Sequence, residues 1–464
     1  MIMLSQVCDA VKGQLVNQSG GADLAIGGVS INTRSNCVDR LFVAIKGDNF
    51  DAHEFVQQAK EAGACALLVE RNVESSLPTI KVKDTRQALA DLSTWWRSNF
   101  DIPVVGVTGS VGKTSVKEML ACIFSELGRG IATKGNLNNE LGVPLTLMRL
   151  AKNDKYAIVE MGMNNAGEIA RITKMARPTI ALINNAAAAH LEGLGSIEAV
   201  ADAKAEIFQG LSEDGVAIIN KDDRFANDWL AQTKQFRQLT FSLETDADIT
   251  ASFQEKGDDL IMSVRYQDQC FDIAVHALGE HNARNSLAAI AVSIASSISI
   301  EKIQSGLRAY RPVVGRLNRS HVGQLTLIDD TYNANPLSML AAINVLVKYP
   351  SNTLIVGDMA ELGDAAEAEH ALLGQRAAES GVSNLLVCGS FAHTVVESFK
   401  KTSKDSKESA IAFVSQSELI KYAIAHISSG TVLVKGSRSA AMERVVNALI
   451  KSKQNASSAQ GGIH

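Results

Sequence analysis

The stretch GVTGSVGKTS, residues 106–115, constrains the fold of this chain more than any other feature. The apolar residues up to Val107 predict a strand, and the glycine-rich turn after them ends in Gly-Lys-Thr. Beyond the turn, apolar residues recur at helical spacing from Val116 to Leu127 and stop at Gly128. A strand, a glycine turn and a helix in this order are typical of a phosphate-binding loop, which belongs to a parallel sheet.

This loop is suited to the phosphates of ATP. Backbone N–H groups and the helix N-terminus form an anion cradle, Lys113 adds a positive charge, and Thr114 offers an oxygen ligand to Mg²⁺. Val107 departs from the usual spacing, because the motif expects glycine there. Switches, motors and kinases also carry such loops, so the loop alone does not name the reaction. The predicted ATP-binding residues of the loop are Thr108, Gly109, Ser110, Val111, Gly112, Lys113, Thr114 and Ser115.

The composition is that of a globular protein. A chain of 464 residues with 46% hydrophobic and 20% charged residues suggests about three domains. The net charge of −5 and the lack of a long basic run argue against nucleic acid as a partner. Six scattered cysteines without a C-x-x-C pair favour a reducing compartment. The N-terminus lacks a secretory pattern, and the longest uncharged run is too short to span a membrane. We expect a cytoplasmic monomer.

Apolar runs divide the chain into three α/β segments. In residues 1–85, runs such as LFVAIKG and ACALLVE predict strands with a helix between them. Residues 86–312 open with a helix and then alternate strands such as VVGV, YAIVEM and TIALIN with helices, which favours a mostly parallel sheet covered on both faces. Residues 313–452 repeat this alternation and predict a Rossmann-like doubly wound domain. Residues 453–464 are polar and small, which predicts a disordered tail.

Three further residues indicate a reaction centre beside the phosphate loop. Glu160 ends the strand YAIVEM and His190 follows TIALINN, so both should lie at the carboxyl edge of the sheet, where ligands collect. A solvated carboxylate and a hydrogen-bonded loop histidine are the alternatives. Lys204 lies on the apolar face of its predicted helix, where an ammonium extends to solvent, pairs or loses its proton. A neutral amine reacts with carbon dioxide to give a carbamate that would meet Mg²⁺; a salt bridge to Glu206 or Glu160 is the alternative.

Several motifs together resemble those of the Mur ligase family of peptidoglycan precursor synthesis. They are TGSVGKTS, KGNLNNELGVP, EMGMNNAGEI, AKAEIF, GEHNARNSLAA and DDTYNANPLSM. The resemblance implies that ATP, with Mg²⁺, phosphorylates the terminal carboxylate of UDP-N-acetylmuramoyl-tripeptide, and that the amine of D-alanyl-D-alanine then attacks the acyl phosphate. Another Mur ligase activity is one alternative. Folylpolyglutamate synthase, a second alternative, shares this architecture, but a domain before the phosphate loop argues against it. A nucleotide-dependent switch or scaffold is a further alternative, for which Glu160 and Lys204 would be surplus.

The resemblance also implies roles for individual residues. Lys113, Glu160, His190 and Lys204 would act in catalysis, and the metal sites would use Thr114 together with Glu160, His190 and Lys204 as its carbamate. Further residues implied to bind ATP are Asn282, Asn285, Arg316, Asp330, Tyr332 and Asn333. In the first segment, residues 1–85, the resemblance implies binding of the UDP moiety, whose uridine would contact two loops with Thr33, Arg34, Ser35, Lys46, Gly47 and His53. The other residues implied to bind the substrates are Asn138, Asn139, Asn335, Lys435, Ser437 and Arg438.

Some of these assignments have a structural alternative. Asn282 and Asn285 would also serve as helix N-caps, and the loop from Tyr332 to Asn335 would also form a turn before a proline. Because the two halves of the implied site lie in different segments, we expect a hinge at residues 312–316 whose closure assembles the site and excludes water.

Overall fold

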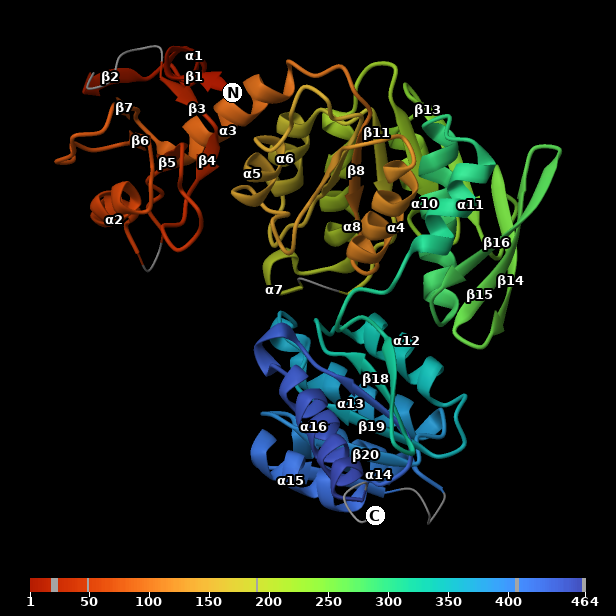
Figure 1. Cartoon of the computed structure of the whole chain (residues 1–464). Coiled ribbons are helices and arrows are strands. Elements are labelled where there is room, and N and C mark those ends of the chain that lie inside the picture. The colour runs from red at the N-terminus through yellow and green to blue at the C-terminus, as the bar shows by residue number, and fades with distance from the viewer. Residues whose placement is uncertain (18–23, 48–49, 189–190, 405–408, 461–464) are drawn as a thin grey trace.

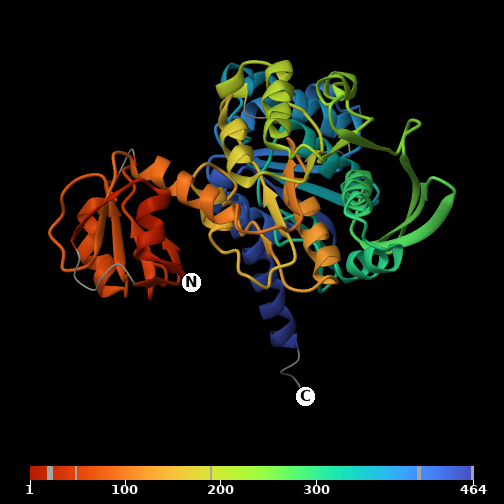
Figure 2. The same ribbon diagram turned by 90° about the horizontal axis from the view of Figure 1, so that it is seen from above.

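The computed structural model describes residues 1–17, 24–47, 50–188, 191–404 and 409–460, with the backbone alone for 455–460. The described chain forms three α/β domains, each built around its own sheet, which confirms the predicted fold class (Figure 1). Seen from above, the N-terminal domain stands apart from the other two (Figure 2). None of the described helices combines the length and the apolar character needed to cross a membrane.

The N-terminal domain is a small mixed sheet with two short helices. Its elements are β1 (Ile2–Met3), α1 (Leu4–Ala10), β2 (Gln14–Asn17), β3 (Ala25–Ile26), β4 (Gly28–Ser30), β5 (Arg40–Val43), η1 (Ala52–Phe55), α2 (Val56–Glu61), β6 (Ala66–Val69) and β7 (Thr79–Lys81). The main sheet has the order β2-β7-β6-β5-β4, in which only β2 pairs antiparallel. The two predicted strands are β5 and β6, and η1 with α2 is the predicted helix between them.

Helix α3 (Thr85–Arg97) joins this domain to the next. Asp84 caps it by accepting hydrogen bonds from two backbone N–H groups of the first turn. Its Leu89 and Leu92 belong to the core of the N-terminal domain. At the other end, the indole N–H of Trp96 donates to the carbonyl of Leu150 at 3.1 Å, inside the central domain. One continuous helix is therefore packed into both domains.

The central domain is a nine-stranded sheet. Its elements are β8 (Val104–Thr108), α4 (Lys113–Ser125), β9 (Ile131–Ala132), α5 (Gly142–Leu147), β10 (Ala157–Glu160), α6 (Glu168–Ala176), β11 (Ile180–Ile183), α7 (Leu191–Leu194), α8 (Ile197–Ala205), η2 (Glu206–Gly210), β12 (Val216–Asn220), α9 (Ala226–Gln232), β13 (Arg237–Ser242), β14 (Ile249–Lys256), β15 (Asp259–Tyr266), β16 (Gln269–His276), α10 (Glu280–Ala295) and α11 (Ile300–Ala309). Separate apolar cores fill the two faces of the sheet, one under α4, α10 and α11 and one under α5, α6 and α8. The sheet is mostly parallel and covered on both sides, as predicted.

Three antiparallel strands extend this sheet beyond β13, and the sequence reading did not identify them. The order is β16-β15-β14-β13-β12-β11-β8-β10-β9, with β15 antiparallel to both β14 and β16. Their side chains alternate between buried and exposed, which is the period of a strand with one solvent-exposed face. That alternation was the available signal.

The C-terminal domain is a six-stranded sheet in the order β17-β18-β22-β19-β20-β21, with only β17 antiparallel. Its elements are β17 (Asn318–Val322), β18 (Leu325–Asp330), α12 (Pro336–Leu346), β19 (Asn352–Val356), η3 (Gly363–Ala365), α13 (Ala366–Glu379), β20 (Asn384–Cys388), α14 (Ala392–Thr402), β21 (Ser409–Phe413), α15 (Gln416–His426), β22 (Gly430–Lys435), η4 (Arg438–Ala440) and α16 (Glu443–Gln460). The predicted disordered tail from residue 453 is wrong for the backbone up to Gln460, because extending a helix that already exists needs no new nucleation.

Candidate active site

The phosphate loop lies where the strand order of the central sheet reverses. β8 comes first in the chain and has β11 on one side and β10 on the other. The connection after β8 runs toward β9 on one side and the connection after its neighbour β11 runs toward β12 on the other, which opens a crevice at the carboxyl ends of these strands. Thr108 ends β8, Glu160 ends β10, and Asn184 follows β11. Three polar residues from neighbouring strands therefore meet at this edge.

The unusual Val107 belongs to the strand and not to the loop. It is fully buried and pairs with Glu160 on β10 and with Leu182 on β11. The glycine that the turn does require is Gly112, whose φ is 82°. A Cβ at Gly112 would lie 2.6 Å from the amide nitrogen of Asn184, so only glycine fits there.

Asn184 and Asn185 form one wall of the loop, and sequence reasoning missed both. The Asn184 side chain donates to the carbonyl of Val111 at 3.1 Å, and the N–H of Val111 donates to Oδ1 of Asn185 at 2.9 Å. The hydroxyl of Ser110 donates to the carbonyl of Ala187 at 3.0 Å. Two asparagines directly after an apolar strand, at the edge where the loop lies, were the signal that could have identified them.

Asn282 and Asn285 approach the loop from the first turns of α10. The side chain of Asn184 donates to Oδ1 of Asn285 at 2.9 Å, and Asn285 donates in turn to Asn282 at 3.1 Å. The N-cap position of α10 is Gly279, so neither asparagine caps this helix. Asn285 lies beside Gly112 of the loop and Asn282 lies behind it, and their nucleotide-binding role stays a prediction.

Arg316 reaches the loop from the start of the C-terminal domain. Its Nη2 donates to the hydroxyl of Thr114 at 3.0 Å, and its guanidinium stacks on Tyr332, 4.2 Å from the ring centre. Inside the loop, the ammonium of Lys113 donates to the carbonyl of Gly109 at 2.6 Å. Burial lowers the pKa of Lys113, and the negative charge of Glu160 opposes that shift. Residues of two domains therefore share one charged site.

Glu160 is the candidate metal ligand. Its side chain is buried, and its Oε1 accepts a hydrogen bond from the amide of Asn138 at 2.8 Å. Its Oε2 has no hydrogen-bond partner among the described residues, and an unsatisfied carboxylate oxygen is the kind of ligand that Mg²⁺ prefers. Among the described residues, no three His, Cys, Asp or Glu side chains are arranged to hold a metal ion, so an ion here would also need the hydroxyl of Thr114 and phosphate oxygens. The predicted ligand His190 lies outside the described residues.

Lys204, at the end of α8, is almost completely buried. Its ammonium lies 3.7 Å from the sulfur of Met163, and no described carboxylate forms an ion pair with it. Burial lowers the pKa of Lys204 well below its ordinary value, and the positive charge of Lys113 adds to this effect. The carboxylate of Glu206 instead accepts two backbone hydrogen bonds at the start of α6. The suggested salt bridges to Glu206 and Glu160 are therefore not formed.

Asp330 and Lys435 form a buried ion pair at the carboxyl edge of the C-terminal sheet. The ammonium of Lys435 donates to Oδ2 of Asp330 at 2.6 Å and to the carbonyl of Asn333 at 2.9 Å. Burial raises the pKa of Asp330, although the charges of Lys435 and Arg316 pull the pKa down. Arg316 therefore lies within electrostatic reach of both Asp330 and the phosphate loop.

Several predicted site residues make structural contacts. Asn139 accepts backbone hydrogen bonds at the start of α5, and Asn335 caps α12. Ser115 shares a hydrogen bond with Tyr310. Ser437 lies before η4, buried, and Arg438 there is exposed and pairs with a glutamate of α16. The turn alternative thus holds for Asn335.

The predicted uridine-binding residues occupy two loops of the N-terminal domain. His53 is buried, with its Nδ1 at 2.6 Å from Asp51 and its Nε2 accepting the N–H of Glu70, so it holds its own loop together. Lys46 is exposed, while its carbonyl accepts hydrogen bonds from Arg86. The remaining predicted residues of these loops, Thr33, Arg34, Ser35 and Gly47, are exposed or half-buried.

A cleft of about 1590 Å³ separates the N-terminal domain from the central domain. Six cationic side chains line it, against only two acidic ones, so the cleft favours an anionic ligand. The cationic residues are Arg40, Arg129, Lys134, Arg149, Lys152 and Lys155, and the acidic ones are Asp101 and Asp154. Ser30, Asn32 and Ser35 line the same cleft, which places one of the two predicted uridine loops on it.

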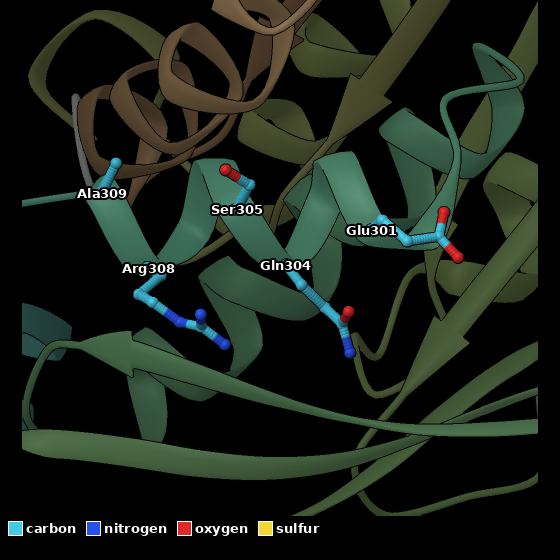
Figure 3. A pocket seen from close by; sticks show the side chains of 5 residues that line it. All are labelled: Glu301, Gln304, Ser305, Arg308 and Ala309. Carbon is cyan, nitrogen blue, oxygen red and sulfur yellow. The ribbon is translucent and has the colours of Figure 1, made fainter.

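A smaller hollow of about 320 Å³ lies along α11 (Figure 3). All five lining side chains come from this one helix, among them Gln304, Ser305 and Arg308. Ser305 and Gln304 already bond to neighbouring elements, through Glu126 and the carbonyl of Asp272. No convergent set of polar groups from several elements makes this hollow a second site.

Comparison with known proteins points to one family. The model of the Mur ligase middle domain matches residues 107–293, and that of the Mur ligase glutamate ligase domain matches residues 315–438. The chain is 42% identical to the UDP-N-acetylmuramoyl-tripeptide–D-alanyl-D-alanine ligase of Escherichia coli K12, over 97% of this chain and 98% of that protein.

Solved structures agree with this result. A crystal structure of MurF from Acinetobacter baumannii superposes with a TM-score of 0.90 at 32% identity, covering 97% of this chain and 98% of that one. MurF ligase from Thermotoga maritima in complex with ADP gives a TM-score of 0.81 at 26% identity, covering 93% and 99%. The chain belongs to the Mur ligase family.

Proposed function

We propose that this protein is an ATP-dependent ligase that joins D-alanyl-D-alanine to UDP-N-acetylmuramoyl-tripeptide. The observation that carries the proposal is the contact of Arg316 with Thr114, because it brings the C-terminal domain onto the phosphate loop beside Lys113 and Glu160. A ligase of this kind needs ATP and two further substrates at one place, and a site shared by two domains provides it. A switch would need only the loop.

The chemistry requires that like charges be neutralised. A carboxylate oxygen of the tripeptide attacks the γ-phosphorus of ATP, ADP leaves, and an acyl phosphate forms. The amine of D-alanyl-D-alanine then attacks the carbonyl carbon, phosphate leaves, and the amine gives up a proton as the amide forms. Two unit charges of like sign repel by about 4 kcal/mol at 4 Å in a medium of effective dielectric 20. Lys113 and Arg316 supply positive charge where this repulsion arises.

We assign the magnesium site to Glu160 and Thr114, together with the Lys204 carbamate and His190. When bound, Mg²⁺ neutralises phosphate charge and orients the triphosphate. The buried Oε2 of Glu160 without a partner supports this assignment. Asn138 holds the other oxygen of Glu160 and so fixes its orientation.

The Lys204 carbamate follows from the environment of the side chain. A neutral lysine amine and carbon dioxide give the carbamate and one proton, which solvent takes up. The lowered pKa of Lys204 supplies the neutral amine, and the positive charge of nearby Lys113 would stabilise the anion that results. Mass spectrometry under native conditions should find a labile adduct of about 44 Da, the mass of CO2. The substitution Lys204→Met should abolish this adduct.

The UDP end of the first substrate belongs in the basic cleft between the N-terminal and central domains. A diphosphate carries the negative charge that the cleft favours, and Asn32 and Ser35, at the two ends of one predicted uridine loop, line its wall. We further propose a monomer that works in the cytoplasm. All six cysteines are free, which fits a reducing compartment, and sedimentation velocity would test the monomer.

Phosphate release under three conditions tests the function. We expect release with ATP, UDP-N-acetylmuramoyl-tripeptide and D-alanyl-D-alanine, and only background release with folate plus glutamate or with ATP alone. Release that depends on folate and glutamate would identify the rival ligase. Equal release in all three conditions would contradict a ligase and favour a nucleotide-dependent switch.

A further inference from the structure

The β14–β15 hairpin, residues 249–266, touches the C-terminal domain at its tip. The ammonium of Lys348, just after α12, donates to Oε1 of Glu255 at 2.7 Å. In the turn of the hairpin, Asp258 pairs with Arg319 of β17. Figure 1 shows this end of the hairpin beside α12. Two ion pairs therefore join the central and C-terminal domains at this point, and in both of them the acidic residue belongs to the hairpin. The covalent connection between the two domains lies elsewhere, at residues 310–317.

The carboxylate of Glu255 also holds the start of α10. The backbone N–H of Gly279, the N-cap residue of this helix, donates to the same Oε1 at 3.1 Å. The first turns of α10 carry Asn285, which lies against Gly112 of the phosphate loop, and Asn282, which accepts a hydrogen bond from Asn285. One carboxylate thus connects Lys348 of the C-terminal domain with the helix that supports the loop.

Apolar packing reinforces the same contact. Leu278, just before α10, belongs to the hydrophobic core of the C-terminal domain together with Met339 and Ile343 of α12. A Cβ on Gly279 would lie 2.9 Å from Cγ2 of Val345, so the backbone approaches α12 closely. The start of α10 is therefore seated in the C-terminal domain as well as beside the phosphate loop.

Ion pairs of this exposure contribute little to global stability. The side chain of Lys348 is 50% exposed and that of Glu255 is 26% exposed, and such pairs typically change an equilibrium constant by only about 1.4- to 5-fold. A change of that size matters little for folding, which lies far from balance, but it clearly shifts the populations of two domain arrangements that are close in free energy. The expected role is therefore in domain position.

We propose that the β14–β15 hairpin is a docking arm that holds the C-terminal domain over the phosphate loop, with Glu255 as its positioning residue. Lys348 and Arg319 are the residues that it engages. Glu255 acts through α10 and Lys348 and touches no reacting atom. The functional part of this inference rests on the proposed ligase activity, whereas the docking part does not.

Charge exchange on the full-length protein tests the docking arm. Glu255→Lys and Lys348→Glu each place like charges together, and the double variant restores an opposite pair. We expect small-angle scattering without ligand to show a fraction of extended molecules raised about 3- to 10-fold in each single variant and restored in the double variant. Asp268→Lys, at the opposite end of the same strands, is the matched control and should leave scattering unchanged. Circular dichroism verifies that each variant folds. If a charge-reversal variant does not fold, Lys348→Met is measured in its place.

Kinetics separate docking from a purely structural effect. In the double variant the scattering should return to that of the wild type, but the KM for ATP should stay about 3-fold above the wild-type value. The reason is that a lysine at position 255 cannot accept the hydrogen bond that the N–H of Gly279 donates to Glu255. Single variants that scatter like the wild type, or a double variant that stays as extended as the single ones, would overturn the proposal. Scattering needs no turnover, so its result stands apart from the outcome of the ligase assay.

Discussion

The two joints between the three domains are built in opposite ways. At the first joint, α3 runs unbroken from the N-terminal core into the central domain, and a wide basic cleft lies beside it. At the second joint, residues 310–317 form no helix or strand, and side-chain ion pairs and a small apolar contact hold the domains together. The first joint is suited to hold a large substrate in place. The second is suited to open and close around ATP.

The charged groups follow this division. The first cleft presents a surplus of cations, with Arg40 on the wall of the N-terminal domain and the other five on the wall of the central domain. The second joint brings Arg316 to the phosphate loop and places the Asp330–Lys435 pair within reach of it. Binding and chemistry are therefore expected to depend on different joints, and substitutions should separate them.

The largest effect is expected for Lys113→Met, at the phosphate loop. Removing a charge that stabilises the transferring phosphoryl group should lower kcat by at least about 100-fold. Binding of the UDP-linked substrate at the first joint should be unchanged, as measured by calorimetry. Lys174→Met, an exposed lysine on α6, is the matched control. A loss of UDP-substrate affinity in Lys113→Met would contradict the division between the joints.

Acid should weaken the second joint through His281 of α10. Burial, with the charge of Lys435, lowers the pKa of His281 from 6.5 to about 4, and Lys348 and Glu255 also face it. Below pH 6.5 the imidazole of His281 binds a proton in the unfolded chain but stays neutral in the folded protein. The free energy of unfolding therefore falls as the pH drops from 6.5 to 4, by at most about 3 kcal/mol. Urea unfolding of the wild type and of His281→Gln across this range measures the difference. An equal acid loss in the variant would show that His281 is not its source.

A smaller effect is expected for Arg316→Lys. Lysine keeps the charge but loses the planar stacking on Tyr332 and the reach to Thr114. The value of kcat/KM for ATP should fall by about 10-fold, as expected for one charged hydrogen bond. The KM for the UDP-linked substrate should not change. Steady-state kinetics with each substrate varied in turn decides the matter, and wild-type values for ATP would exclude Arg316 from the site.

The smallest effect is expected at the first joint, for Lys134→Met. Lys134 is exposed and lines the basic cleft. Losing one of six cations should raise the KM for the UDP-linked substrate about 3-fold at low salt and less at high salt, because mobile ions screen exposed charges. The KM for ATP should stay the same. An effect on ATP alone would place the UDP group elsewhere.

Local patterns in the sequence predicted the central features of the fold. The phosphate loop is a strand, a turn and a helix that are adjacent in the chain, and the apolar stripe around Lys204 correctly indicated a buried lysine. Contacts between distant segments were not predictable in this way. Asn184 meets Val111 only because β11 pairs with β8, and Glu255 meets Lys348 only because two domains are docked. Asn335 was predicted to bind substrate, and its side chain caps α12. Asparagine is suited both to a helix cap and to a ligand contact, so the sequence alone did not separate the two roles.

The transfer of an oxygen atom tests the central claim most directly. If ATP activates the tripeptide carboxylate at a site shared by the central and C-terminal domains, one carboxylate oxygen must leave with the phosphate. With the terminal carboxylate of UDP-N-acetylmuramoyl-tripeptide labelled with oxygen-18, we expect each released phosphate to carry one labelled oxygen by mass spectrometry. Unlabelled phosphate released together with the amide product would contradict this account.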